Sequence, residues 1–71
     1  MGLCNRLREI RLEQQLTQEA LAQRVGVTRQ TIIAIETEKF VPSVRLALEL
    51  AQALDTPMAE LFWLDGSKRR K

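Results

Sequence analysis

The sequence contains no histidine and only one cysteine, Cys4, among its 71 residues. A single cysteine cannot form an internal disulfide, which fits a reducing compartment, and we expect a cytoplasmic protein. A catalytic cysteine needs a base beside it, and no histidine is present to act as one. A histidine or cysteine cluster for a metal and a glycine-rich loop for a phosphate are also missing. We therefore expect neither an enzyme nor a cofactor or metal site.

Glycine, proline and aromatic residues are scarce, whereas leucine, isoleucine, valine and alanine are common. This composition favours helix over sheet and predicts an all-α fold. The length fits one small domain, which buries a smaller share of its surface than a large one and so gains from pairing with a second copy. We find no apolar run long enough to cross a membrane and no signal peptide. Neither a membrane nor a small-molecule ligand is expected as a partner.

The positive charges are unevenly placed. The formal net charge is +2, and Lys68, Arg69, Arg70 and Lys71 end the chain as a basic run. The rest of the chain carries seven basic and nine acidic residues. Affinity for a nucleic acid would therefore depend on where individual cations lie. We expect residues 1–66 to form the domain and residues 67–71 a disordered tail, with sequence-independent phosphate attraction as the alternative role of the tail.

The segment 18–37 predicts two short helices joined by a tight turn. Gly26 stands where the chain needs a left-handed residue, and Thr28 can cap the second helix. The residues expected to point inward are Leu21, Ala22, Val25, Ile32 and Ile35. Those expected to face away from the core are Arg29, Gln30, Thr31, Ile33 and Ala34. A helix-turn-helix places the start of its second helix in the DNA major groove, where Arg and Gln can contact base edges. The segment therefore predicts sequence-specific DNA binding.

Helical spacing predicts three further helices. The first runs from about residue 3 to 14, with Leu3, Leu7 and Ile10 on its apolar face. After a loop over 37–42, Ser43 caps a helix from 44 to about 54. Its expected apolar face consists of Val44, Ala47, Leu48, Ala51 and Leu54, with Leu50 beside them. A short helix follows over 58–62, with Pro57 at its first position.

Two stretches resemble one known family: LREIRLEQQLTQEALAQRVGVTRQTIIAIE and KFVPSVRLALELAQALDTPMAELF. With a Gln, an Ala, a Gly and two apolar residues at fixed offsets, the chain resembles the Cro/CI-type (XRE-type) helix-turn-helix repressors over about residues 5–64. The second stretch is most similar to short stand-alone bacterial members. The resemblance implies a five-helix, lambda-repressor-like domain that binds double-stranded DNA as a homodimer.

The resemblance also implies roles for individual residues. Base edges would be read by Thr28, Arg29, Gln30 and Ala34. Phosphates would be contacted by Gln18, Lys39 and the backbone of Phe40. Apart from the resemblance, Thr31 and Arg45 are also expected to contact phosphates. Ala34 can offer only a methyl contact, for example to a thymine methyl. Arg11 and Glu36 would form a structural ion pair. Many relatives carry glycine where this chain has Glu38. Outside this family, an ordinary solvated surface would be the alternative for each polar residue.

Four consecutive apolar residues, 61–64, lie near the end of the chain, with Met58 one turn earlier. A helix this short cannot hide all of them in its own domain. We predict that a dimer surface is formed by Met58, Leu61, Phe62, Trp63 and Leu64. Trp63 and Leu64 can form a short strand, and the alternative is that the group covers the core. Two copies would place their recognition helices about one DNA turn apart, roughly 34–36 Å.

The sequence predicts a homodimeric regulator that reads a roughly palindromic site. Repression is favoured because no activation or ligand-binding domain is evident. One alternative is the antitoxin of a toxin–antitoxin pair, which shares the fold and binds its own promoter. A second is a helical protein-interaction module without DNA binding, for which Glu38 and the acidic body leave room.

Overall fold

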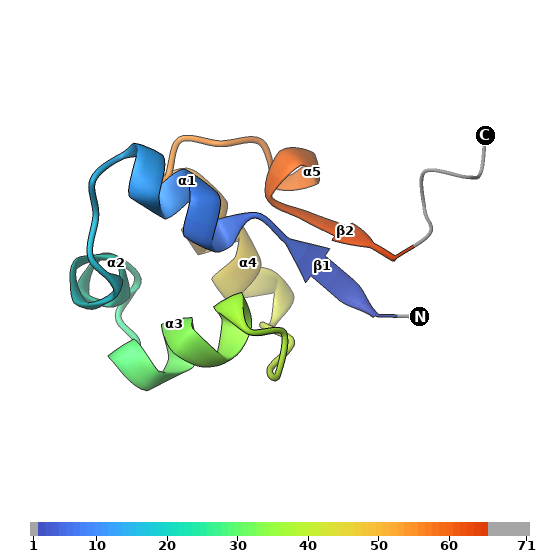
Figure 1. Cartoon of the computed structure of the whole chain (residues 1–71), viewed down its shortest axis with the longest axis horizontal. Helices are drawn as coiled ribbons and strands as arrows, with labels where there is room; N and C mark the ends of the chain where they lie inside the picture. Colours follow the sequence, from blue (N-terminus) through green and yellow to red (C-terminus); the bar gives the residue numbers. More distant parts are fainter. Residues whose placement is uncertain (1, 66–71) are drawn as a thin grey trace.

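The computed structural model describes residues 2–65, which fold into helices packed beside a two-stranded antiparallel sheet (Figure 1). The predicted all-α class with five helices and a short C-terminal strand is confirmed. The predicted tail, residues 67–71, lies outside the described residues. In chain order the elements are β1 (Leu3–Asn5), α1 (Leu7–Glu13), α2 (Gln18–Val25), α3 (Arg29–Glu36), α4 (Val44–Ala53), α5 (Met58–Leu61) and β2 (Phe62–Leu64).

The start of the chain is a strand, so the predicted first helix is wrong over residues 3–5. β1 pairs antiparallel with β2, with Leu3 opposite Leu64 and Asn5 opposite Phe62. Helical spacing from Leu3 to Leu7 misled the prediction because the pairing partner lies at the other end of the sequence. The two strands form an antiparallel ribbon that projects from one end of the helical body (Figure 1).

The core lies where α1 to α5 meet, and the helix-turn-helix contributes its predicted inward residues Leu21, Ala22, Ile32 and Ile35. Val25 is half-buried against them. The whole buried apolar set is Leu7, Ile10, Leu21, Ala22, Ile32, Ile35, Ala47, Leu50, Ala51, Leu54, Leu61 and Phe62. Because the elements are short, residues from every helix are needed to close this core.

The apolar face predicted for α4 is partly wrong. Ala47, Leu50 and Ala51 are buried, but Val44 is 75% exposed and Leu48 is 53% exposed. Successive helical residues are about 100° apart, so Leu48 points roughly 110° away from the centre of the buried arc. Helical spacing alone did not reveal which of two adjacent arcs meets the other helices.

Hydroxyl side chains cap the three longer helices at their starts. Thr17 Oγ1 accepts from Ala20 N at 2.9 Å, Thr28 Oγ1 from Thr31 N at 3.2 Å, and Ser43 Oγ from Leu46 N at 3.1 Å. Each bond satisfies one of the backbone donors that the first helical turn leaves unpaired. Pro57 precedes α5 in extended geometry, so it does not occupy the first helical position as predicted.

Helices α1 to α4 end in the same way, with a left-handed residue and a Schellman pair of backbone bonds. The left-handed residues are Gln15, Gly26, Glu38 and Asp55. After α3, Lys39 N donates to Ala34 O at 2.8 Å and Glu38 N to Ile35 O at 3.0 Å. Only one of these four positions is glycine, so three side chains occupy a backbone region that disfavours them.

A buried ion pair joins α1 to the end of α3. Arg11 Nε lies 2.7 Å from Glu36 Oε2, and the two side chains are 7% and 3% exposed. The pair implied by the resemblance is thus present. Arg11 Nη1 also donates to Leu16 O at 2.8 Å, in the turn before α2. The guanidinium therefore connects two helices and the segment between them.

Replacing Arg11 with alanine should lower the free energy of unfolding by about 3–5 kcal/mol, because the Glu36 carboxylate would be left buried without its partner. The matched control is Arg45→Ala, which removes the exposed Arg45–Glu49 pair and should cost no more than about 1 kcal/mol. Urea unfolding followed by circular dichroism measures both. Equal losses for the two variants would show that burial of the first pair has no special effect on stability.

The left-handed helix ends predict opposite effects of two substitutions. Gly26→Ala should destabilise the domain by about 0.5–1 kcal/mol, and Glu38→Gly should stabilise it by a similar amount, through relief of left-handed strain. An added Cβ at Gly26 meets nothing within 4 Å, so the effect there is conformational. Glu38→Ala is the control, since it removes the charge and keeps the strain. Thermal unfolding of the three variants measures these shifts, and stabilisation by Glu38→Ala as large as that by Glu38→Gly would assign the effect to charge.

Candidate nucleic-acid interface

α2 and α3 form the predicted helix-turn-helix. Gly26 adopts φ +72°, and Val27 N donates to Ala22 O at 3.0 Å across the turn. Ile32 and Ile35 fix the inner face of α3 against the core. The outer face carries Arg29 and Gln30, which are exposed, and Thr31, Ile33 and Ala34, which are half-buried. The turn therefore leaves one face of α3 on the outside of the protein, and that face carries both polar and apolar side chains.

The first turn of α3 is held by two threonines. The hydroxyl of Thr28 accepts from Thr31 N and lies 3.1 Å from the hydroxyl of Thr31. This arrangement leaves the positive end of the helix dipole at the outer surface, next to Arg29. The predicted base-reading residues Thr28, Arg29 and Gln30 are thus brought together at the start of one helix.

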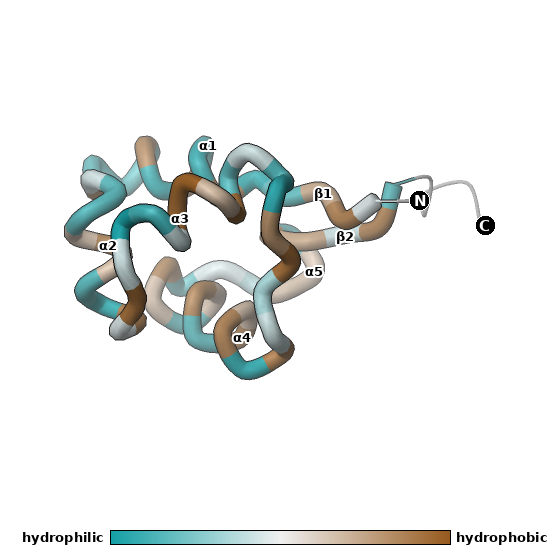
Figure 2. Tube along the Cα trace, turned by 90° about the horizontal axis from the view of Figure 1, so that it is seen from below, coloured by the Kyte–Doolittle hydropathy of each residue, from teal (hydrophilic) through white to brown (hydrophobic). Residues whose placement is uncertain are grey.

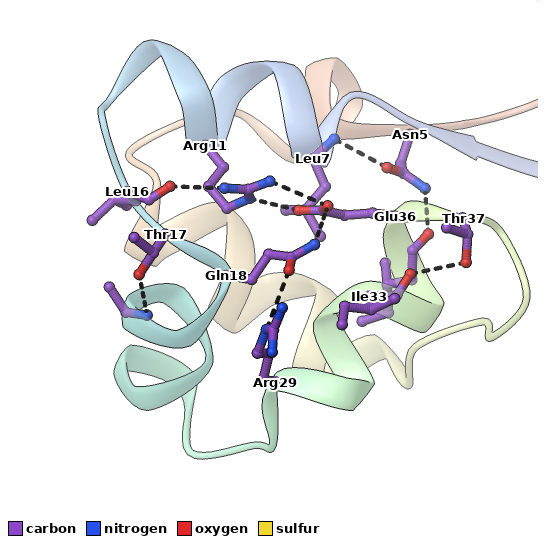
Figure 3. A network of polar contacts seen from close by, with 12 residues as sticks. Asn5, Leu7, Arg11, Leu16, Thr17, Gln18, Arg29, Ile33, Glu36 and Thr37 are labelled. Atoms are coloured by element: carbon purple, nitrogen blue, oxygen red, sulfur yellow. Dashed lines mark hydrogen bonds and ion pairs between the residues drawn. The ribbon is translucent and has the colours of Figure 1, made fainter.

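A chain of polar contacts runs from Arg29 into the protein interior (Figure 3). Arg29 Nε donates to Gln18 Oε1 at 3.4 Å, and Gln18 Nε2 donates to Glu36 Oε1 at 3.1 Å. Glu36 is in turn paired with Arg11. Because the amide nitrogen of Gln18 is engaged by Glu36, its oxygen faces Arg29. The first residue of α2 thereby orients the first residue of α3.

The loop after α3 and the start of α4 carry the other predicted phosphate contacts. Lys39 and Phe40 are exposed. Arg45 is also exposed, but its Nε lies 3.2 Å from Glu49 Oε2. A phosphate would have to compete with that carboxylate, so Lys39 is the better placed of the two cations. Gln30, Thr31, Ala34 and Phe40 together line a shallow hollow beside α3.

The predicted dimer surface is only partly on the outside of the protein. Leu61 is fully buried and Phe62 is 8% exposed, so both belong to the core and their prediction as surface residues is wrong. The physical reason is that the chain turns from α5 into β2 at this point and directs both side chains inward. Trp63 and Leu64 are 37% and 51% exposed, while Met58 is half-buried against the core.

Asn5 and Thr37, which no sequence pattern singled out, support α3 at its end. Asn5 Nδ2 donates to Ile35 O at 2.9 Å, and its Oδ1 accepts from Leu7 N at 3.0 Å. Thr37 Oγ1 donates to Ile33 O at 2.9 Å. An asparagine two residues before Leu7 was an available signal for a helix start there. It was overlooked because the helix was expected to begin at Leu3.

Other kinds of site find little support in the part of the chain that the structure describes. Over residues 2–65, no group of three or more His, Cys, Asp or Glu side chains is arranged to hold a metal ion. None of the helices in that range has the length and apolarity to cross a membrane.

A hydrogen bond from Arg6 to Glu9, together with the charge of Glu9, raises the pKa of Arg6. Arg6 is charged at neutral pH in any case.

Comparisons with known proteins agree with this geometry. A family model described as helix-turn-helix matches residues 7–61. An uncharacterized HTH-type transcriptional regulator of Methanothermobacter thermautotrophicus is 55% identical over 65 residues, covering 87% of this chain and 94% of the relative. The uncharacterized HTH-type transcriptional regulator YgzD of Bacillus subtilis is 44% identical over 61 residues, covering 86% and 92%. Similar relatives thus occur in archaea as well as in bacteria.

Two solved structures are also similar. The restriction-modification controller protein C.AhdI of Aeromonas hydrophila has a TM-score of 0.73 and 38% identity, covering 78% of this chain and 80% of that one. A proposed DNA-binding protein of Bacteroides fragilis has a TM-score of 0.79 and 26% identity, covering 86% and 98%. Because the family model spans most of the chain and relatives of similar length share about half of its residues, this protein belongs to the XRE-type helix-turn-helix family of DNA-binding transcriptional regulators.

Proposed function

We propose that the protein is a homodimeric repressor that reads a roughly palindromic DNA site with α3. The observation that carries this proposal is the outer face of α3, where Arg29 and Gln30 are exposed at the start of a capped helix. Arg suits the O6 and N7 atoms of guanine, and Gln suits adenine. Thr28 and Ala34 border these two residues and would contribute to base reading.

Phosphate contacts would hold α3 in its groove. Gln18 stands at the start of α2, where the helix dipole favours an anion, and its link to Glu36 fixes its amide. Thr31 in the first turn of α3 and Lys39 after its end would contact the DNA backbone on either side. The backbone of Phe40 and the side chain of Arg45 extend this series. These phosphate contacts would fix the position of the protein on the DNA, whereas the base contacts would determine which sequence it prefers.

The dimer is proposed from the exposed apolar residues of β2. Trp63 and Leu64 lie on the ribbon that projects from the body (Figure 1), and Met58 lies in the adjacent helix. A two-fold pair would use the same surface on both copies and match a site with two-fold symmetry. Bound at a promoter, such a dimer represses by occupying the DNA, which requires only the DNA and dimer surfaces. We assign it no enzymatic role and place it with DNA in the cytoplasm.

Selection of bound duplexes from a random pool, at fixed near-physiological salt, tests the function. We expect enrichment of two symmetric half-sites whose centres are about one helical turn apart. A folded protein that enriches no sequence would contradict DNA reading and favour the protein-interaction alternative. A single unpaired half-site would contradict the proposed dimer and leave DNA reading in place.

The same selection separates base contacts from phosphate contacts. Arg29→Ala should cost roughly 1–3 kcal/mol at one base pair of each half-site and relax the preference there. Lys39→Ala, the matched control, should keep the selected sequence and reduce the slope of log K against log salt by about 0.9 per protomer. A uniform loss across sequences for Arg29→Ala would move it to the phosphate contacts, and an unchanged salt slope would remove Lys39 from them.

A lysine at Leu64 should convert the dimer to a monomer at micromolar concentration, because it places a charge on the proposed interface. Leu12→Lys is the control, since Leu12 is 49% exposed on α1 and Leu64 is 51% exposed on β2. Sedimentation velocity measures both variants. Leu61 is unsuitable for this test because its side chain is fully buried. If the Leu64→Lys variant stays a dimer and the Leu48→Lys variant becomes a monomer, the interface is formed by the exposed apolar residues of α4, Val44 and Leu48, and not by β2.

A further inference from the structure

Phe40 is an exposed aromatic residue beside the recognition helix. Its side chain is 47% exposed, although it is among the most apolar in the chain. With Gln30, Thr31 and Ala34 it lines one shallow hollow. Figure 2, which views the molecule from the side of α3, shows apolar positions in the segment that links α3 to α4. An aromatic ring is thus added to the outer face of α3 by a residue that follows the helix.

The local backbone fixes where this ring lies. Lys39 N donates to Ala34 O at 2.8 Å, which ties the start of the loop to the last turn of α3. Two residues after Phe40, Pro42 is buried. Phe40 is therefore held between a closed helix end and an anchored proline. Such preorganisation reduces the entropic cost of using the side chain in a contact.

The lining of the hollow is mainly apolar. Ala34 offers a single methyl group and leaves space above the helix where a longer residue would fill it. The hydroxyl of Thr31 lies 3.1 Å from that of Thr28, within hydrogen-bonding distance in the first turn of the helix. Gln30 also lines the hollow.

We propose that this hollow receives the C5-methyl group of a thymine in each half-site, with Phe40 as a specificity-determining residue. The inference rests on the proposed function, because the hollow is continuous with the face of α3 that would enter the major groove. The thymine methyl is the one apolar group that unmodified B-DNA presents in that groove. A phosphate fits poorly, since no lining residue of the hollow carries a positive charge.

The test replaces each thymine of the selected site, one at a time, with deoxyuridine. This change removes the methyl group and keeps the pairing and the hydrogen-bonding edge. Burial of one methyl group corresponds to about fourfold in affinity. We expect wild-type binding to fall by about this factor at one thymine of each half-site. Phe40→Ala should bind the thymine site more weakly by a similar factor and bind the deoxyuridine site as well as the wild type does.

Two further variants serve as controls for this comparison. Val41→Ala is the matched control, because Val41 is 67% exposed in the same loop and does not line this hollow. It should keep the full sensitivity to the methyl group. Phe40→Leu should retain part of that sensitivity, since leucine keeps an apolar surface at the hollow. Circular dichroism checks that each variant is folded.

Two results would overturn the inference and leave the proposed function standing. One is that the protein binds a specific sequence, but replacing thymine with deoxyuridine weakens binding at none of the thymine positions. The other is a methyl effect of unchanged size in Phe40→Ala, which would place the methyl contact elsewhere on α3. Lack of any sequence-selective binding by the wild type would instead reject the proposed function itself.

Discussion

The buried ion pair between Arg11 and Glu36 is the interaction on which the arrangement of the helices depends. It joins α1 to the end of α3, and Arg11 also holds the carbonyl of Leu16 before α2. Two charges this deeply buried are tolerated only when each is paired and hydrogen-bonded. The pair therefore permits few relative positions of these three elements, since most others would leave a charge without its partner.

The same pair extends to the surface that would meet DNA. Glu36 engages the amide of Gln18, and Gln18 faces Arg29. The buried Glu36 thus influences the orientation of the Arg29 side chain at the start of α3. Because Asn5 and Thr37 hold the other end of that helix, α3 is fixed at both ends. Base reading requires such fixed side chains, since small displacements break bidentate contacts.

A domain of this size has a small free energy of unfolding, so local hydrogen bonds at the helix ends matter to its stability. Hydroxyl residues cap the starts of α2, α3 and α4, and Schellman bonds close the ends of α1 to α4. Three of the four left-handed positions carry Gln, Glu or Asp where glycine would be less strained. Glu38 is one of them, so the loop that carries Lys39 and Phe40 keeps its path despite the missing glycine.

The sequence by itself determined the helix-turn-helix, because its signals are local: Gly26 at the turn, Thr17 and Thr28 as caps, and apolar residues at helical spacing. It also placed Arg29 and Gln30 on the outer face of α3. Only the tertiary structure decided that residues 3–5 form a strand, since their partner is β2 at the other end of the described chain. It likewise decided that Leu61 is buried while Leu48 is exposed. Spacing describes the faces of a single helix, but the other elements determine which of those faces they cover.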